Sequence, residues 1–171
     1  MTVHKKYTVQ LKTIEFDPEF KIDEDLYIAD EDKINNNLDF DKTTILTIND
    51  TQHKEIKIRV DWCNYSTDMN FHTLLIEETD KLLIGPRFFW AVINLNYLRI
   101  ERQEYCAMFW NFEKHSNTII VTTELEALAL DLNCETKDTV PIDPPFDIEY
   151  FENRIEFTSL TAGKQTLNFA N

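Results

Sequence analysis

The chain has 171 residues, 43% of them hydrophobic, and a formal net charge of −14 at pH 7. This length is enough to bury a hydrophobic core, and no apolar run approaches the roughly 20 residues that span a bilayer. So negative a chain repels nucleic-acid phosphates, which argues against direct DNA or RNA binding and favours a basic protein partner.

The start of the chain, MTVHKKYTVQLKTIEF, lacks the apolar stretch of a secretory signal peptide. Within it, Tyr7, Val9 and Leu11 alternate with other residues, which predicts a strand with one face in water. The chain has three cysteines, which lie far apart and form no C-x-x-C motif: Cys63, Cys106 and Cys134. An odd number of cysteines without a secretory signal indicates reduced thiols and a cytoplasmic protein.

A strongly acidic segment follows, from Glu15 to Asp41, with eleven acidic residues against Lys21 and Lys33. It carries −9 of the net charge of −14, and we expect an irregular conformation at about residues 17–43. Charge runs are usually solvated loops. However, apolar residues among the charges are typical of an interface that has an apolar anchor and a charged rim. Apolar residues of this segment include Phe20, Leu26, Tyr27, Ile28, Leu38 and Phe40.

The interface hypothesis predicts residues that bind a basic protein. They are Asp23, Glu24, Asp25, Tyr27, Asp30, Glu31, Asp32 and, from a later part of the chain, Trp110. The aspartates also form two D-x-D pairs, and clustered carboxylates are suitable ligands for calcium. No register supplies both the glycine and the final glutamate of an EF-hand loop. We therefore predict no metal and no cofactor.

Strand patterns dominate the rest of the chain. EIKIRVDW, residues 55–62, alternates strictly between apolar and charged residues, which predicts a strand with one wet face. FENRIEF and LTAGKQTL each predict a hairpin, the second with Gly163 in its turn. The segment TVPIDPPFDIEY predicts a proline-rich connection that enters a strand at Phe146. No window of helical length shows a convincing 3.6-residue period, so we expect little helix.

The stretch from Arg87 to His115 contains eight aromatic residues. Residues 88–95 are apolar on both faces, which predicts a central, buried strand with Trp90 in the core. Residues 105–112 show the same pattern and predict a second strand of this kind. Most of these aromatic side chains are therefore expected in the core, while Trp110 and Tyr97, near strand ends, are the ones expected to reach the surface.

A weak internal similarity recurs at an offset of 37 residues. DKLLIGPRFFWAVINLN, residues 80–96, aligns without gaps to NTIIVTTELEALALDLN, residues 117–133, and a shorter echo begins at Asn153. Fixed periods of this size occur in β-propeller blades. Successive hairpins of any β-meander also look alike, and the first half of the chain does not join the pattern. We therefore favour a simple meander over a propeller.

Common catalytic motifs are missing. Two glycines, Gly85 and Gly163, are too few for the phosphate-binding loops and the nucleophile elbow. No two of the four histidines are spaced as in H-E-x-x-H. A cysteine precedes a histidine by nine residues at Cys63 and again at Cys106. Since nothing in the sequence brings either pair together, we interpret both as coincidence.

Together these patterns predict a single mostly-β domain over residues 1–171, an antiparallel meander or sandwich of about ten strands. For function we expect a non-catalytic cytoplasmic binding protein, most concretely an immunity or inhibitor protein whose acidic surface neutralises a basic, nuclease-like toxin. No membrane partner is expected. Two alternatives stay open: a β-repeat scaffold module, and a carbohydrate-acting β-fold enzyme that uses dispersed carboxylates.

Overall fold

The computed structural model of this protein describes residues 6–29, 40–52, 54–64 and 71–169. These residues form fifteen strands and no helix, which confirms the mostly-β prediction, although about ten strands were expected. The strands are β1 (Tyr7–Glu15), β2 (Leu26–Ala29), β3 (Lys42–Asp50), β4 (Glu55–Trp62), β5 (His72–Ile76), β6 (Lys81–Gly85), β7 (Phe89–Asn94), β8 (Arg99–Tyr105), β9 (Phe109–His115), β10 (Thr118–Thr123), β11 (Glu126–Leu130), β12 (Thr136–Pro141), β13 (Phe146–Tyr150), β14 (Arg154–Ser159) and β15 (Gly163–Asn168).

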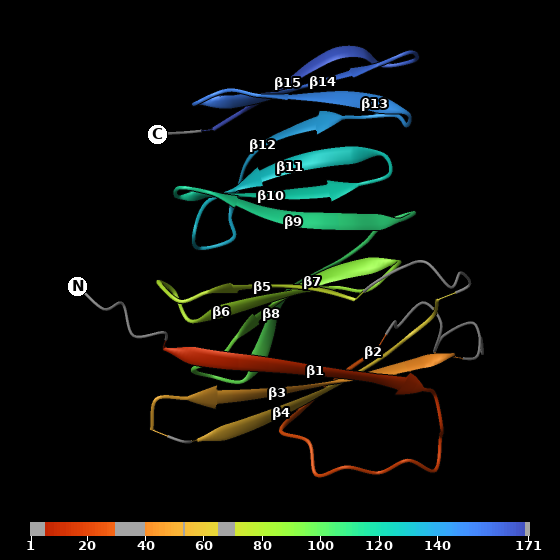
Figure 1. The fold of residues 1–171 in the computed structure, drawn as a ribbon, viewed down its shortest axis with the longest axis vertical. Helices are drawn as coiled ribbons and strands as arrows, with labels where there is room; N and C mark the ends of the chain where they lie inside the picture. The colour runs from red at the N-terminus through yellow and green to blue at the C-terminus, as the bar shows by residue number, and fades with distance from the viewer. Residues whose placement is uncertain (1–5, 30–39, 53, 65–70, 170–171) are drawn as a thin grey trace.

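The strands form four sheets that stack along the long axis of the molecule (Figure 1). Sheet A has the order β1-β3-β4-β2, sheet B β5-β6-β7-β8, sheet C β12-β11-β10-β9 and sheet D β13-β14-β15. Sheets B, C and D are antiparallel meanders in sequence order. Sheet A differs, because β2 lies inside the acidic segment and pairs in parallel with β4.

The 37-residue similarity is matched by the strand boundaries from sheet B onward. The first strands of sheets B, C and D begin at His72, Phe109 and Phe146, each 37 residues after the previous one. The third strands β7, β11 and β15 begin at the same interval, at 89, 126 and 163. The meander and the repeat are thus one feature, since each sheet is a meander and the meander recurs with a fixed period.

Three clusters of buried apolar residues lie between successive sheets, and they explain the composition of the middle strands. The first cluster joins sheets A and B, the second sheets B and C, and the third sheets C and D. In β6, Leu82 and Ile84 belong to the first cluster and Leu83 to the second. A strand covered on both faces is apolar at every position, and β7 is buried throughout, with Trp90 only 1% exposed.

The predicted continuous strand over residues 105–112 is wrong. β8 ends at Tyr105, and β9, in the next sheet, begins at Phe109. Between them the Cys106 N–H donates to the carbonyl of Phe88 at 2.9 Å, and the Phe109 N–H donates to that of Arg87 at 2.7 Å. The chain crosses from sheet B to sheet C here without glycine or proline, so the apolar pattern continues through the turn and conceals it.

The sheets are stacked so that corresponding edge strands lie on the same side. On each side, edge strands of neighbouring sheets contact each other. On one side β5 contacts β9, and the Tyr150 hydroxyl of β13 donates to Glu113 of β9 at 3.1 Å. On the other side Gln103 Nε2 of β8 donates to the Ala29 carbonyl of β2 at 3.2 Å, and β12 contacts β15. One side of the stack is therefore made by the edge strands β5, β9 and β13, and the other by β2, β8, β12 and β15.

Candidate acidic binding surface

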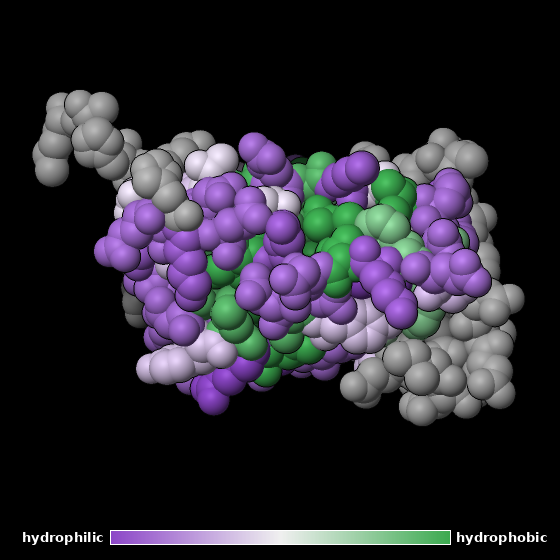
Figure 2. All heavy atoms as spheres, turned by 90° about the horizontal axis from the view of Figure 1, so that it is seen from below, coloured by the Kyte–Doolittle hydropathy of each residue, from purple (hydrophilic) through white to green (hydrophobic). Residues whose placement is uncertain are grey.

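Residues 16–25 of the acidic segment, which connect β1 to β2, pass below sheet A in the view of Figure 1 and so form one end of the described structure. Figure 2 looks at this end, where hydrophilic residues surround a band of hydrophobic ones. The segment is tied to the sheet by main-chain contacts: the Phe16 N–H donates to the Asp41 carbonyl at 3.0 Å, and the Phe20 carbonyl accepts from Arg59 Nη1 at 2.7 Å. These contacts hold its course against the outer face of β3 and β4.

Arg59 fastens the aromatic residues of the segment to the sheet. Its guanidinium lies 5.9 Å from the Phe20 ring and 5.7 Å from the Tyr27 ring, within the range of cation–π attraction. The same guanidinium pairs with Asp61, which is 1% exposed, at 2.9 Å between Nη2 and Oδ2. Thr43 Oγ1 also donates to this carboxylate, at 2.6 Å. The buried charge is thus paired and hydrogen-bonded, as a buried carboxylate must be.

The alternation of side chains along β4 determines which face of sheet A carries Arg59 and Asp61. Ile58 and Val60 face the core, so Arg59 and Asp61 face the opposite side, toward the acidic segment. Tyr27 is paired with Arg59 across β2 and β4, and its side chain is 46% exposed. Burial and the nearby Asp61 carboxylate raise the pKa of Tyr27 to about 12. Its hydroxyl therefore stays protonated at neutral pH.

The carboxylates around Tyr27 differ in their hydrogen bonds and in their exposure. Asp25 is held by two hydrogen bonds of 2.8 Å: its N–H donates to the Lys57 carbonyl, and its Oδ2 accepts from the Lys57 N–H. Glu24 is half-buried, whereas Asp23 is exposed. Asp17 and Glu19 are also exposed and lie in the same segment. We call Asp17, Glu19, Asp23, Asp25 and Tyr27 the acidic end.

The predicted partner-binding residues do not all come together. Asp23, Asp25 and Tyr27 belong to the acidic end, and Glu24 lies between the first two in the chain, while Asp30, Glu31 and Asp32 fall outside the described residues. Trp110 lies in β9 of sheet C, and Figure 1 shows sheet B between sheets A and C. Trp110 is half-buried and stacks on Phe146 of β13, with ring centroids 5.2 Å apart. Tyr97, by contrast, is 73% exposed.

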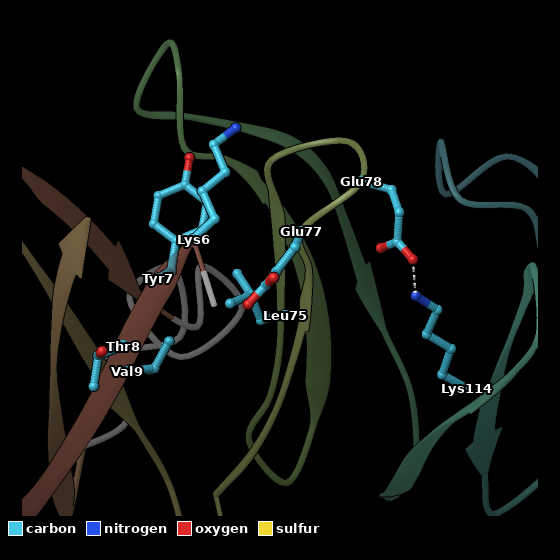
Figure 3. Close-up of a pocket in the computed structure, with 8 residues that line it drawn as sticks. All are labelled: Lys6, Tyr7, Thr8, Val9, Leu75, Glu77, Glu78 and Lys114. Carbon is cyan, nitrogen blue, oxygen red and sulfur yellow. Dashed lines mark hydrogen bonds and ion pairs between the residues drawn. The ribbon is translucent and has the colours of Figure 1, made fainter. Parts of the chain in front are cut away.

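A cavity of about 830 Å³ opens between β1, the end of β5 and β9 (Figure 3). Its charged residues are largely paired, since Lys6 pairs with Asp80 and Lys114 with Glu78. A glycoside hydrolase needs a carboxylic acid with a raised pKa. The hydrogen bond from Lys114 instead lowers the pKa of Glu78, so this carboxylate is a poor general acid.

The cysteines have the properties of core residues. Cys63 and Cys134 are buried, and Cys106 is half-buried. Burial raises the pKa of Cys106 to about 12 and that of Cys134 to about 11. A protonated thiol is a weak nucleophile. His115 is the last residue of β9 and Cys106 precedes the first, and a seven-residue strand is about 20 Å long, so this pair is not a nucleophile and its base.

The described residues contain no group of three or more histidine, cysteine, aspartate or glutamate side chains placed to hold a metal ion. Across these same ranges, no helix is long and apolar enough to cross a membrane.

A second acidic region escaped the sequence analysis. Residues 124–152 contain nine acidic residues and one basic residue, Lys137, and so carry a charge of −8. With −9 in the first segment, the rest of the chain carries +3. A running charge count along the sequence would have found this region. Its acidic residues are separated by neutral residues, however, and do not form an obvious run. They lie in sheets C and D, at the opposite end of the stack (Figure 1).

Comparison with known proteins leaves the family open. No protein-family model matches this chain, and no curated protein sequence matches it. Hsv2 from Kluyveromyces marxianus aligns with 8% identity and a TM-score of 0.36, over 72% of this chain and 46% of that one. Hsv2 from Kluyveromyces lactis aligns with 12% identity and a TM-score of 0.30, over 58% and 38%.

A third solved structure covers almost the whole chain. It is an S. cerevisiae structure of a Dbp5 variant bound to Nup159, a Gle1 variant, IP6 and ADP, and it aligns with 11% identity and a TM-score of 0.42, over 99% of this chain and 49% of that one. This chain therefore spans less than half the length of each of these three structures. Scores this low define neither its family nor its function.

Proposed function

We propose that this chain is a non-catalytic, cytoplasmic binding protein that engages a basic protein partner through the acidic end of sheet A. The observation that carries the proposal is the Arg59 clamp, which fixes Phe20 and Tyr27 against the sheet beneath exposed carboxylates. A rigid aromatic side chain within a charged rim is typical of a protein interface. A purely solubilising loop would not need this clamp.

Within this class we propose an immunity or inhibitor protein that neutralises a nuclease-like toxin. Enzymes that act on nucleic acids present basic clefts, and complementary charge speeds the encounter of two proteins and suppresses wrong partners. The net charge of −14 supports such a role. The half-exposed Tyr27 would supply the apolar contact that charge alone does not give.

The test compares the wild type with two triple charge reversals. Asp17, Glu19 and Asp23 are replaced by Lys in the first, and Asp147, Glu149 and Glu152 in the second. All six residues are exposed, so both variants should fold, which circular dichroism would check. Each variant makes the same change in net charge at a different end of the molecule, so each is the matched control for the other.

Proteins retained by each immobilised variant at low salt would be identified, purified and measured individually. We expect a basic protein whose association rate falls steeply with salt. We also expect the first reversal to slow this association at least tenfold and to relieve inhibition of any nuclease activity that the partner has. If the first reversal binds every purified protein as fast as the wild type does, the acidic end is not a recognition surface.

A scaffold role is the second candidate, and the 37-residue spacing of sheets B, C and D favours it. Four-stranded antiparallel meanders at a fixed period are the building units of β-propellers and related arrays, which often present binding surfaces. Under this alternative the partner need not be basic. Binding would then be insensitive to salt and to both charge reversals.

A further inference from the structure

The edge strand β13 is open on one side. Among the described residues it pairs only with β14. The Phe151 N–H points toward β14, where it donates to the Arg154 carbonyl at 2.9 Å. Backbone groups alternate in direction along a strand, so those of Ile148 and Tyr150 point away from β14. They form an unpaired row of donors and acceptors at the edge of sheet D.

The side chains along this edge are exposed although several are apolar. Ile148, Tyr150 and Phe151 are 39%, 51% and 39% exposed. Tyr150 stacks on His115 of β9, with centroids 5.4 Å apart, and Phe151 lines a cavity of about 560 Å³ with His115 and Phe169. The stacked pair of Trp110 and Phe146 begins the same strip at the other end of β13.

The opposite face of β13 is acidic. Asp147 and Glu149 alternate with Ile148 and Tyr150, and Glu152 follows in the turn; all three carboxylates are exposed and form no ion pair with any described residue. The surrounding residues 124–152 carry −8. A strand that added to this edge would therefore meet apolar side chains on one face and carboxylates on the other.

Two other edge strands, β15 and β1, have features that protect them against such pairing. At β15, the outward-pointing N–H of Asn168 already donates to Asp138 Oδ2 at 2.8 Å, and Lys164 lies on the same strand. The edge strand β1 carries Lys12 near its centre. Lysines and capped backbone groups are devices that prevent edge-to-edge association. β13 has no lysine, and its backbone edge stays accessible.

We propose that the β13 edge binds an extended segment of a protein partner in which basic and apolar residues alternate, as an additional strand of sheet D. Main-chain hydrogen bonds to residues 148 and 150 provide affinity, and the two faces of the strand provide specificity. The apolar residues of the partner pack on Ile148 and Tyr150. Its lysines or arginines face Asp147 and Glu149. This surface is separate from the acidic end of sheet A and does not depend on the function proposed for it.

The probe is a fluorescent eight-residue peptide that alternates lysine and valine. One control peptide has its alternate backbone nitrogens methylated, which removes hydrogen-bond donors and keeps the charge. A second replaces lysine by glutamate. Binding to the full chain is measured by fluorescence anisotropy. We expect the lysine–valine peptide to bind and both control peptides to bind at least tenfold more weakly, which is a loss of about 1.4 kcal/mol or more.

Two variants of the chain complete the experiment. Ile148→Pro removes one edge donor without breaking a hydrogen bond to β14 and should weaken binding about tenfold. The triple reversal of Asp147, Glu149 and Glu152 should do the same, whereas the reversal of Asp17, Glu19 and Asp23 should have no effect. The proposal fails if the peptide does not bind, if the methylated peptide binds equally well, or if only the sheet A reversal matters. The methylated peptide keeps the test decisive should Ile148→Pro not fold.

Discussion

At the scale of single residues, the least exposed aromatic side chains lie where two sheets meet. Trp90 lies in the middle strand of sheet B and packs in the cluster shared with sheet C. Its ring is also covered by the guanidinium of Arg102, 4.6 Å from the centroid, and this Arg in turn donates to the Cys134 carbonyl at 3.1 Å. Trp90 therefore contributes to the core and supports a polar link between two sheets.

Replacement of Trp90 by alanine should lower the free energy of unfolding by about 3–5 kcal/mol, because a large cavity would remain in a close-packed core. Trp110→Ala should lower the free energy of unfolding by less, because Trp110 is only half-buried, where it stacks on Phe146. Urea unfolding followed by circular dichroism would measure both. Equal losses for the two variants would contradict the different burial of these residues.

At the scale of elements, the approach of β6 to β9 depends on a missing side chain. A Cβ added at Gly85 would lie 2.3 Å from Cε1 of Phe109. Phe109 is 3% exposed and packs against Phe112 and His72, with centroids at 4.5 and 5.7 Å. The ring has little room to move, so glycine at position 85 lets sheet C pack closely on sheet B.

Gly85→Ala should accordingly destabilise the protein by about 1–3 kcal/mol through overpacking. Phe109→Leu would remove the clash at the cost of a smaller core side chain. A double-mutant cycle should then show the pair of substitutions to cost less than the sum of the two, by roughly 1 kcal/mol. Strictly additive losses would show that Gly85 and Phe109 do not limit each other.

A second element-level contact joins β1 to the β5–β6 turn through Asp80. Lys6 and Tyr7 donate to its Oδ1, Tyr7 at 2.9 Å, and Asn96 donates to Oδ2 at 3.0 Å. The hydrogen bond from Lys6, together with those from Asn96 and Tyr7, holds the pKa of Asp80 below its ordinary value. A carboxyl whose pKa is lowered by folding stabilises the protein above its unfolded pKa and loses this effect as the pH falls.

The stability of the wild type should therefore decrease as the pH falls below about 4, the usual pKa of an aspartate. Asp80→Asn should flatten this decrease, and asparagine suits the position because the backbone there has a φ of 53°. Lys6→Met, which removes the first partner, should flatten it as well. Urea midpoints at several pH values between 3 and 7 would measure the effect. Parallel curves for wild type and Asp80→Asn would exclude this linkage.

At the scale of the whole molecule, the acidic residues that the structure describes lie mainly toward the two ends of the stack. The segment of residues 15–41 carries −9, residues 124–152 carry −8, and the rest is weakly basic. The outer side of sheet A is crossed by the acidic segment, while charged residues such as Arg154, Glu156 and Lys164 pair on sheet D. Both outer faces of the described stack thus carry charged residues.

So high a net charge destabilises the compact state through repulsion, and salt screens this repulsion. The melting temperature should rise by a few degrees between about 10 and 300 mM NaCl. Either triple charge reversal lowers the net negative charge, so its melting temperature should depend less on salt. A wild-type melting temperature that falls with salt would mean that its ion pairs outweigh the repulsion.

Patterns local in sequence were enough to predict the strand class, the buried strand at residues 88–95 and the hairpins near the C-terminus, because side-chain alternation is a property of each strand alone. Only the tertiary structure placed β2 parallel to β4, turned the chain at residues 106–108 and separated Trp110 from Asp23, Glu24 and Tyr27. These features depend on contacts between residues far apart in the chain, such as Arg59 with Phe20 and Gly85 with Phe109. A single sequence carries no period or spacing that records such contacts, so the tertiary structure, within and between sheets, decided them.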